Sequence, residues 1–136
     1  MADEPDPELT AQVAAAAPFT SFLGIEIVSA SPHEVRGRLA WSEDKCTSGG
    51  ILHGGALMGL ADNLGGTLAF LNLPADARGT ATIESKTNFF AAVRSGFVHG
   101  VARPLHTGRR TIVVDTELYD DAGTLVARVT QTQAVL

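Results

Sequence analysis

Two features of one stretch of the chain have residue types that can do chemistry. The stretch runs from Gly49 to Leu73, reads GGILHGGALMGLADNLGGTLAFLNL, and has helical composition for roughly five turns after His53. Helix N-termini leave backbone N–H groups without partners, and Gly54 and Gly55 leave those groups open to an anion. Donors of this kind form an oxyanion hole, and His53 is placed to hold the loop or add a donor. The alternative is a tight turn followed by a histidine that only packs.

The second feature is Asp62, the only ionisable residue between Gly54 and Leu73, with Asn63 beside it. A carboxylate in an otherwise apolar helix costs free energy unless it is paired, hydrated or used. As a structural residue, Asp62 would be buried and would fix the helix against a sheet by hydrogen bonds. As a chemical group, it would be the general base or the nucleophile of a hydrolysis.

The spacing of these two features predicts how they combine. Asp62 lies eight residues after Gly54, which is about 12 Å along one helix at 1.5 Å per residue. One substrate carbonyl cannot touch both groups when they come from the same helix. The functional interpretation therefore predicts a homodimer with shared sites, in which Gly54 of one helix faces Asp62 of a roughly antiparallel second copy.

Composition bounds the class of protein. The chain has 136 residues, which predicts one domain with a core of its own, and its net charge of −5 argues against general nucleic-acid binding. A single cysteine, Cys46, excludes an intrachain disulfide and favours a reducing, cytoplasmic location. The start, MADEPDPELT, lacks the features of a signal peptide, and no apolar run suits a membrane span.

The N-terminal part is expected to be accessory to the domain. We expect residues 1–17 to form an acidic tail over 1–6 and a short helix over 7–17, ended by Pro18, and residues 18–136 to form one domain. Phe19 and Phe22 are expected to anchor this segment on the core.

Alternating hydrophobicity predicts strands on both sides of the central helix. GIEIVSA, from Gly24, is the first, and HEVRGRLAW is the second, with Val35, Gly37 and Leu39 on one face. Four more strands follow the helix: Thr80–Phe90, Ser95–Pro104, Arg110–Tyr119 and Thr124–Val135. Short turns between them, including His106-Thr107-Gly108, imply antiparallel pairing. The fold class is α+β, a strongly curved antiparallel sheet wrapped around one long helix.

Several spaced motifs resemble a known family. LHGGALMGLADNLGG is similar to the HGG-x-x-x-x-L-A-D signature of the hotdog-fold acyl-CoA thioesterases, in their PaaI-like (phenylacetate-pathway type) branch. The resemblance extends from FTSFLGI, at Phe19, through TATIESKTNFF, at Thr80, to the hairpin DAGTLVA, at Asp121. It implies the hotdog fold, homodimers whose sheets join edge to edge, and often homotetramers formed as dimers of dimers.

The resemblance also implies roles for residues. The catalytic carboxylate falls on Asp62, the backbone N–H that polarises the thioester carbonyl falls on Gly54, and the preceding histidine is His53. Relatives often carry Asn or Gln six residues before the histidine, where this chain has Thr47 with Ser48 beside it. Further residues are expected to bind substrate or position water: Asn63, Thr82 and Phe89, with Leu64 and Phe90 beside them in the acyl pocket.

The nucleotide end of coenzyme A is anionic and needs cations. Arg109 and Arg110 follow His106-Thr107-Gly108, a loop that the family places near the pantetheine and nucleotide. Arginine suits phosphate because of its planar fork. We expect Arg109 to make the main phosphate contact, with His106, Gly108 and Arg110 beside it.

The expected function is hydrolysis of an acyl-CoA, with an aryl-acyl or medium-chain acyl group, to a free acid and CoA. A hotdog domain that binds acyl-CoA without turnover is the alternative. A hotdog hydratase would need a His and an acid in a different arrangement, which this sequence does not show. The four histidines show no metal spacing with acids, so we expect no metal, and no cofactor beyond the CoA of the substrate.

Overall fold

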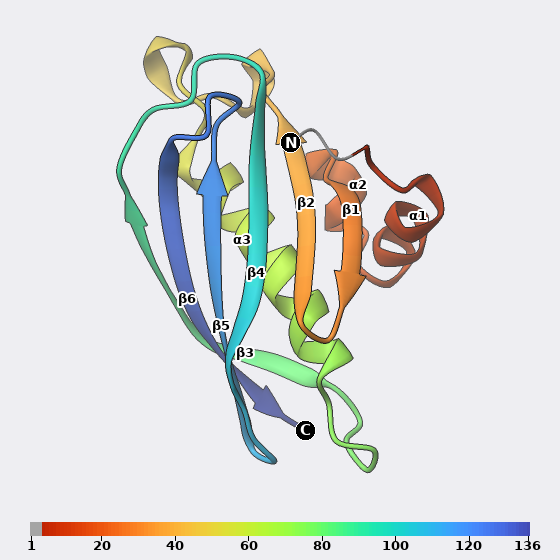
Figure 1. Cartoon of the computed structure of the whole chain (residues 1–136). Helices are drawn as coiled ribbons and strands as arrows, with labels where there is room; N and C mark the ends of the chain where they lie inside the picture. Colours follow the sequence, from red (N-terminus) through yellow and green to blue (C-terminus); the bar gives the residue numbers. More distant parts are fainter. Residues whose placement is uncertain (1–3) are drawn as a thin grey trace.

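The computed structural model describes residues 4–136 as a curved sheet around one long helix, α3 (Figure 1). The three α-helices are α1 (Pro7–Ala16), α2 (Phe19–Leu23) and α3 (Gly54–Leu71). The strands are β1 (Glu26–Ser31), β2 (Glu34–Ala40), β3 (Thr80–Phe89), β4 (Phe97–Thr107), β5 (Thr111–Tyr119) and β6 (Leu125–Val135). The α+β class and the central position of the helix are therefore as the sequence predicts.

The strands form one antiparallel sheet in the order β1-β2-β4-β5-β6-β3. The chain leaves the sheet after β2, forms α3, and returns with β3 at the far edge, where β3 pairs only with β6. The sheet curves around α3 along its length (Figure 1). The unpaired side of β3 is thus an edge ten residues long.

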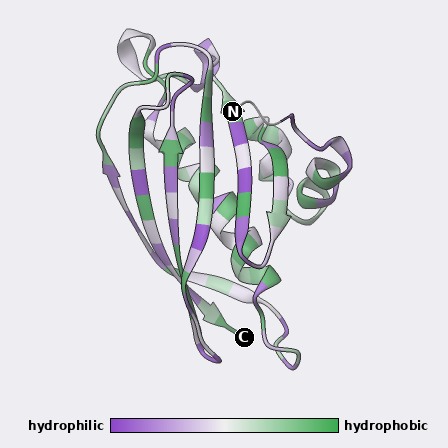
Figure 2. Cartoon of the chain, viewed as in Figure 1, coloured by the Kyte–Doolittle hydropathy of each residue, from purple (hydrophilic) through white to green (hydrophobic). Residues whose placement is uncertain are grey.

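Alternation places one face of each inner strand on the helix (Figure 2). In β2, Val35, Gly37 and Leu39 are buried, as the pattern predicts. At Gly37 and Gly100 a Cβ would lie 2.7 and 2.5 Å from side-chain atoms of Leu64, so a larger residue at either position would displace this side chain. These two bare positions let α3 approach the sheet closely.

The helix α3 buries only one of its faces. Its buried residues are Ala56, Leu57, Leu60, Ala61, Leu64, Gly65, Leu68 and Ala69. The opposite face is open in the single chain, and Asp62 lies on it, exposed. Leu64 packs in the core rather than in an acyl pocket.

The N-terminal segment differs in part from the expectation. The helix α1 forms where the sequence predicts it, with Asp6 as its N-cap, and Thr10 ties it to the backbone of Ile27 at 2.9 Å. The anchoring role of Phe19 and Phe22 is wrong, since these rings are 60% and 79% exposed. The buried anchors of α2 are Thr20 and Leu23. Of the predicted tail, residues 1–3 lie outside the described part of the chain, whereas Asp6 is bonded to Ile27.

Strand ends also differ at one hairpin. The sequence predicts that the strand beginning at Ser95 ends at Pro104, but β4 continues to Thr107. Its register with β5 shifts between Pro104 and His106, so a bulge accommodates the proline and pairing resumes. His106 and Thr107 are therefore strand residues rather than a turn.

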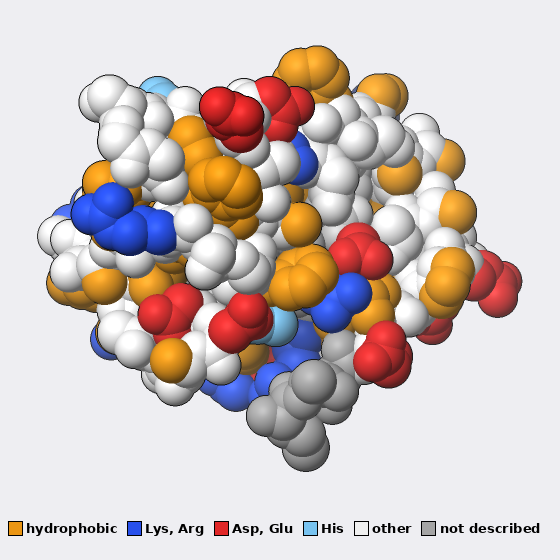
Figure 3. Space-filling model, turned by 90° about the horizontal axis from the view of Figure 1, so that it is seen from above, with side chains coloured by type: hydrophobic (Ala, Val, Ile, Leu, Met, Phe, Trp, Pro, Cys, Tyr) orange, Lys and Arg blue, Asp and Glu red, His pale blue; other side chains and the backbone are white. Residues whose placement is uncertain are grey.

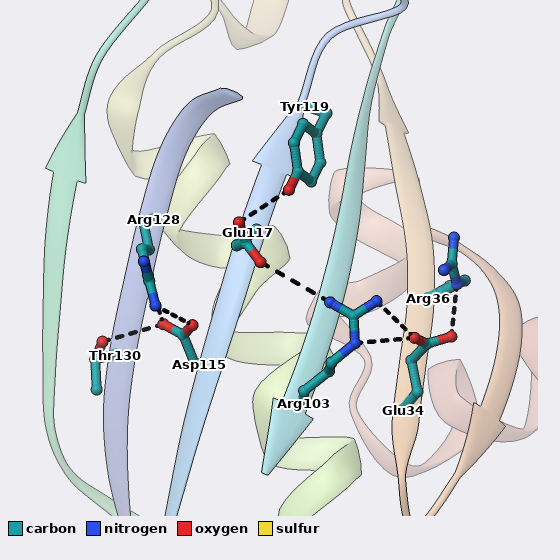
Figure 4. Close-up of polar contacts among 8 residues, drawn as sticks. All are labelled: Glu34, Arg36, Arg103, Asp115, Glu117, Tyr119, Arg128 and Thr130. Carbon is teal, nitrogen blue, oxygen red and sulfur yellow. Dashed lines mark hydrogen bonds and ion pairs between the residues drawn. The ribbon is translucent and has the colours of Figure 1, made fainter. Parts of the chain in front are cut away.

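The outer face of the sheet carries a set of ion pairs across β2, β4, β5 and β6 (Figure 4). Arg103 bridges Glu34 at 2.9 Å and Glu117 at 3.8 Å. Arg128 contacts both carboxylate oxygens of Asp115, at 3.1 and 2.8 Å. Arg103 and Arg128 are thus engaged within the sheet.

Two carboxyl groups on this side have lowered pKa values. The hydrogen bond from Arg36 holds the pKa of Glu34 below its ordinary value, against the opposing effect of burial. The hydrogen bond to His99, at 2.7 Å, does the same to the pKa of Asp121. Both groups therefore favour the folded chain when they are ionised.

Candidate active site

His53 precedes α3 and caps its N-terminus. Its Nδ1 accepts the N–H of Gly55 at 2.7 Å, so a neutral His53 carries its proton on Nε2. The next two N–H groups, of Ala56 and Leu57, bond to the carbonyl of His53. Among the described residues, the Gly54 N–H has no hydrogen-bond partner. One backbone donor at the positive end of the helix is thus left for an oxygen from outside the chain.

Phe89 covers the Cα of Gly54. A Cβ at Gly54 would lie 3.0 Å from the tip of the Phe89 ring, which is half exposed. The predicted substrate residue Phe89 therefore lies next to the free N–H, and a side chain at Gly54 would crowd this space.

Hydrogen bonds fix the loop before α3. The indole of Trp41 donates to the carbonyl of Gly50 at 3.0 Å, and Arg94 donates to that of Gly49 at 3.3 Å. Thr47 and Ser48 lie exposed in this loop, and the Thr47 N–H bonds to the carbonyl of Ile51. Figure 3 views this end of the molecule, where hydrophobic side chains lie at the surface among charged ones.

Asp62 lies in the middle of α3 with Thr82 of β3 near it. The Thr82 hydroxyl is 3.5 Å from Asp62 Oδ1, at the long end of hydrogen-bonding distance. The amide of the neighbouring Asn63 donates to the buried hydroxyl of Thr20 at 2.6 Å. Asn63 thus joins α3 to α2, while Asp62 keeps a carboxylate open to solvent.

A groove of about 530 Å³ starts at Asp62 and runs between α1 and α3. Leu9, Val13 and Ala16 form the α1 wall, and Gly66, Thr67 and Phe70 form much of the α3 wall. No atom lies within 4 Å of a Cβ built on Gly66, so the groove is open above this glycine. The sequence alone did not predict this groove, because the alanine-rich helix α1 has no residue type that indicates a binding surface.

The predicted CoA loop lies elsewhere in the same chain. His106, Arg109 and Arg110 are exposed at the β4–β5 hairpin, at the end of the sheet away from the start of α3 (Figure 1). The Arg110 carbonyl accepts from the Val135 N–H at 2.9 Å, which ties the hairpin to the end of β6. Gly108 fits because a Cβ would lie 2.7 Å from the His106 ring. One chain therefore does not bring this loop to Gly54.

Both predicted reactive groups belong to the single helix α3, so about 12 Å separates them along its axis. Among the described residues, no group of three or more His, Cys, Asp or Glu could hold a metal ion, and no helix is long and apolar enough to cross a membrane.

The geometry agrees with the comparison with known proteins. The family model described as "Thioesterase superfamily" matches residues 49–127. The 1,4-dihydroxy-2-naphthoyl-CoA hydrolase of Escherichia coli is 34% identical over 87 residues, which cover 64% of this chain and 63% of the relative.

Solved structures give the same result. A mutant of thioesterase PA1618 from Pseudomonas aeruginosa has a TM-score of 0.87 at 29% identity, covering 97% of this chain and 94% of that one. A mutant of the phenylacetic acid degradation protein PaaI from Thermus thermophilus has a TM-score of 0.80 at 26% identity, covering 88% and 99%. Because the family model matches more than half of the residues, this chain belongs to the thioesterase superfamily and is a thioester hydrolase with the hotdog fold.

Proposed function

We propose that this protein hydrolyses an acyl-CoA to a free acid and CoA, in sites that two copies of the chain share. In each site, the Gly54 N–H of one copy hydrogen-bonds the thioester oxygen, and Asp62 of the other copy activates water. Water adds to the carbonyl carbon as Asp62 takes one of its protons, the C–S bond breaks, and Asp62 returns that proton to the sulfur, so that CoA leaves as the thiol and the acid remains. Alternatively, Asp62 attacks the carbonyl itself, and water then hydrolyses the mixed anhydride.

One observation carries this proposal: the Gly54 N–H lacks a partner within the described chain, while the exposed Asp62 lies eight residues along the same helix. A donor at a helix N-terminus stabilises negative charge that develops on oxygen. The distance along α3 excludes their joint action on one carbonyl within one chain. The open face of α3 and the unpaired edge of β3 are surfaces on which a second copy would complete the sites.

The groove between α1 and α3 is the proposed place of the acyl group. It begins at the Asp62 carboxylate and is mainly apolar, with Val13, Ala16 and Phe70 in its walls. From Asp62 to Phe70 the helix rises about 12 Å. This length suits a medium-chain acyl group or an aryl-acyl group, and the name of the Escherichia coli relative includes an aryl-acyl CoA substrate.

The proposed contact for the CoA phosphates is the pair Arg109 and Arg110. Both side chains are exposed, and neither takes part in an ion pair within residues 4–136. By contrast, Arg103 is bound to two carboxylates.

Release of CoA thiol from a panel of aryl and straight-chain acyl-CoAs tests the proposal. We expect Asp62→Asn, which keeps the shape of the side chain, to lower kcat by roughly 10²–10⁴-fold, the usual contribution of a general base. Undiminished turnover by this variant would refute the mechanism. Tight acyl-CoA binding without turnover by the wild type would instead indicate a binding protein.

A further inference from the structure

Two glutamines lie inside the protein, under the helix that carries Asp62. Gln131 and Gln133 are 0% and 2% exposed, on the face of β6 that packs toward α3. A Cβ on Gly65 would lie 2.7 Å from the Gln131 amide, so the glutamines fit because α3 is bare at this point. Amides in a hydrophobic core cost free energy unless hydrogen bonds compensate. Apolar residues would be the simpler choice for stability.

The hydrogen bonds of Gln133 hold its amide in one orientation. Its Oε1 accepts from the Thr80 hydroxyl at 2.9 Å. Its Nε2 donates to Thr82 Oγ1 at 2.7 Å and to Gln131 Oε1 at 2.5 Å. Both N–H groups of a primary amide are then used. Gln131, in contrast, has a buried Nε2 with no partner among the described residues, so the pair is not arranged for stability alone.

The hydrogen bond from Gln133 sets the direction in which the Thr82 hydroxyl donates. A hydroxyl has one hydrogen to donate, and it rotates to suit its neighbours. Because Thr82 Oγ1 accepts from Gln133, its own hydrogen is free to point at Asp62 Oδ1, 3.5 Å away. The chain of donors runs from the core of the protein to the carboxylate. Hydrogen bonds to an ionised carboxylate are stronger than neutral ones and fix its orientation.

We infer that Gln133 is a positioning residue for the reaction, acting on Asp62 through the Thr82 hydroxyl. The inference rests on the proposed role of Asp62 as base or nucleophile. Gln133 is 2% exposed and bonds to Thr82, so its contribution reaches the carboxylate through Thr82. Gln131 supports it by accepting the second N–H of the amide.

A double-mutant cycle tests this route, since two residues that act in series give effects that do not add. The variants are Thr82→Val, Gln133→Met and the double variant, with Thr82→Ser to restore the hydroxyl. We expect each single variant to lower kcat roughly tenfold, a part of what a general base supplies, with KM within about twofold. The double variant should be no slower than Thr82→Val, and Thr82→Ser should be near wild type.

The matched control is Thr132→Val, which removes the bond from Thr132 to Glu84 at 2.9 Å between the same two strands. It should leave kcat unchanged. If Gln133→Met does not fold, Thr80→Val releases Gln133 Oε1 from the exposed edge strand, and should lower kcat only when Thr82 is present. An unchanged kcat in Gln133→Met would overturn the inference, and so would an unchanged kcat in Thr80→Val if Gln133→Met does not fold. The inference would also be overturned if the losses of kcat in Gln133→Met and Thr82→Val multiply in the double variant. Full activity of Asp62→Asn would overturn the proposed function as well.

Discussion

Filling the groove at Gly66 should shorten the acyl chains that the enzyme accepts. Gly66 lies four residues after Asp62 on α3, about 6 Å further along the helix. A Cβ there meets no atom within 4 Å, and Gly66 lines the groove, so Gly66→Leu directs its side chain into the groove. Acyl carbons near Asp62 should keep their contacts, whereas carbons beyond Gly66 should lose their contacts with the groove.

The size of the effect follows from the buried methylenes. If three methylenes of a long acyl chain lose contact with the groove, at about 0.8 kcal/mol each, the loss is about 2.4 kcal/mol. That loss corresponds to roughly 60-fold in kcat/KM, at 1.36 kcal/mol for each factor of ten. Short acyl-CoAs should keep their wild-type kcat/KM, so the preference of the enzyme changes rather than its chemistry.

The assay is CoA release from a series of straight-chain acyl-CoAs of increasing length. Gly66→Ala is the matched control: it should keep the long-chain activity and raise the Tm, because alanine is the better helix former by about 1 kcal/mol. An equal loss for all chain lengths in Gly66→Leu, or no loss at all, would refute the assignment of the groove.

Three more predictions concern the helix start, pH and coenzyme A. His53→Ala should lower the free energy of unfolding by about 1 kcal/mol through loss of the cap, and His53→Asn should retain most of it, as denaturant titration can measure. The pKa values of Glu34 and Asp121 are lowered in the folded state from ordinary values of 4.5 and 3.8, so the stability that they give is present above those values. This stability should be lost as the pH falls through the lowered pKa values. Tm measured against pH should therefore drop less steeply in Glu34→Gln than in the wild type, and an identical drop in both would contradict the prediction. Arg109→Ala with Arg110→Ala should raise KM for acyl-CoA about tenfold but leave KM for an acyl-pantetheine, which lacks the nucleotide, unchanged; equal changes for both substrates would contradict the phosphate contact.

The sequence predicts most of the secondary structure because alternating apolar and polar residues mark the buried face of the inner strands. Val35, Gly37 and Leu39 alternate with polar residues and are buried as expected. The continuation of β4 past Pro104 is not visible, because a bulge depends on the partner strand, and His106-Thr107-Gly108 has the composition of a turn.

The site is predictable only where spacing alone decides it. The separation of Gly54 and Asp62 needs no more than the helical rise, and α3 contains both residues as expected. The groove and the contact from Gln133 to Thr82 depend on which residues of distant segments meet, and periodicity does not contain that information. Gln131 and Gln133 offered one signal, since they occupy inward positions of a strand whose inward residues Ala127 and Val129 are apolar.

The central claim is that one copy supplies Gly54 and another supplies Asp62. Gly54→Pro tests the first half cleanly, because proline removes the N–H and suits the first position of a helix. Gly54→Ala adds a Cβ at the same place near Phe89 but keeps the donor, so it controls for crowding.

The decisive measurement is the kcat of mixed oligomers made by co-expressing Gly54→Pro and Asp62→Asn chains with two different affinity tags. A mixed dimer has one site with both groups intact, so we expect it to recover about half of the wild-type kcat per dimer although each parent is inactive. Mixed dimers as inactive as the parents would contradict the shared site.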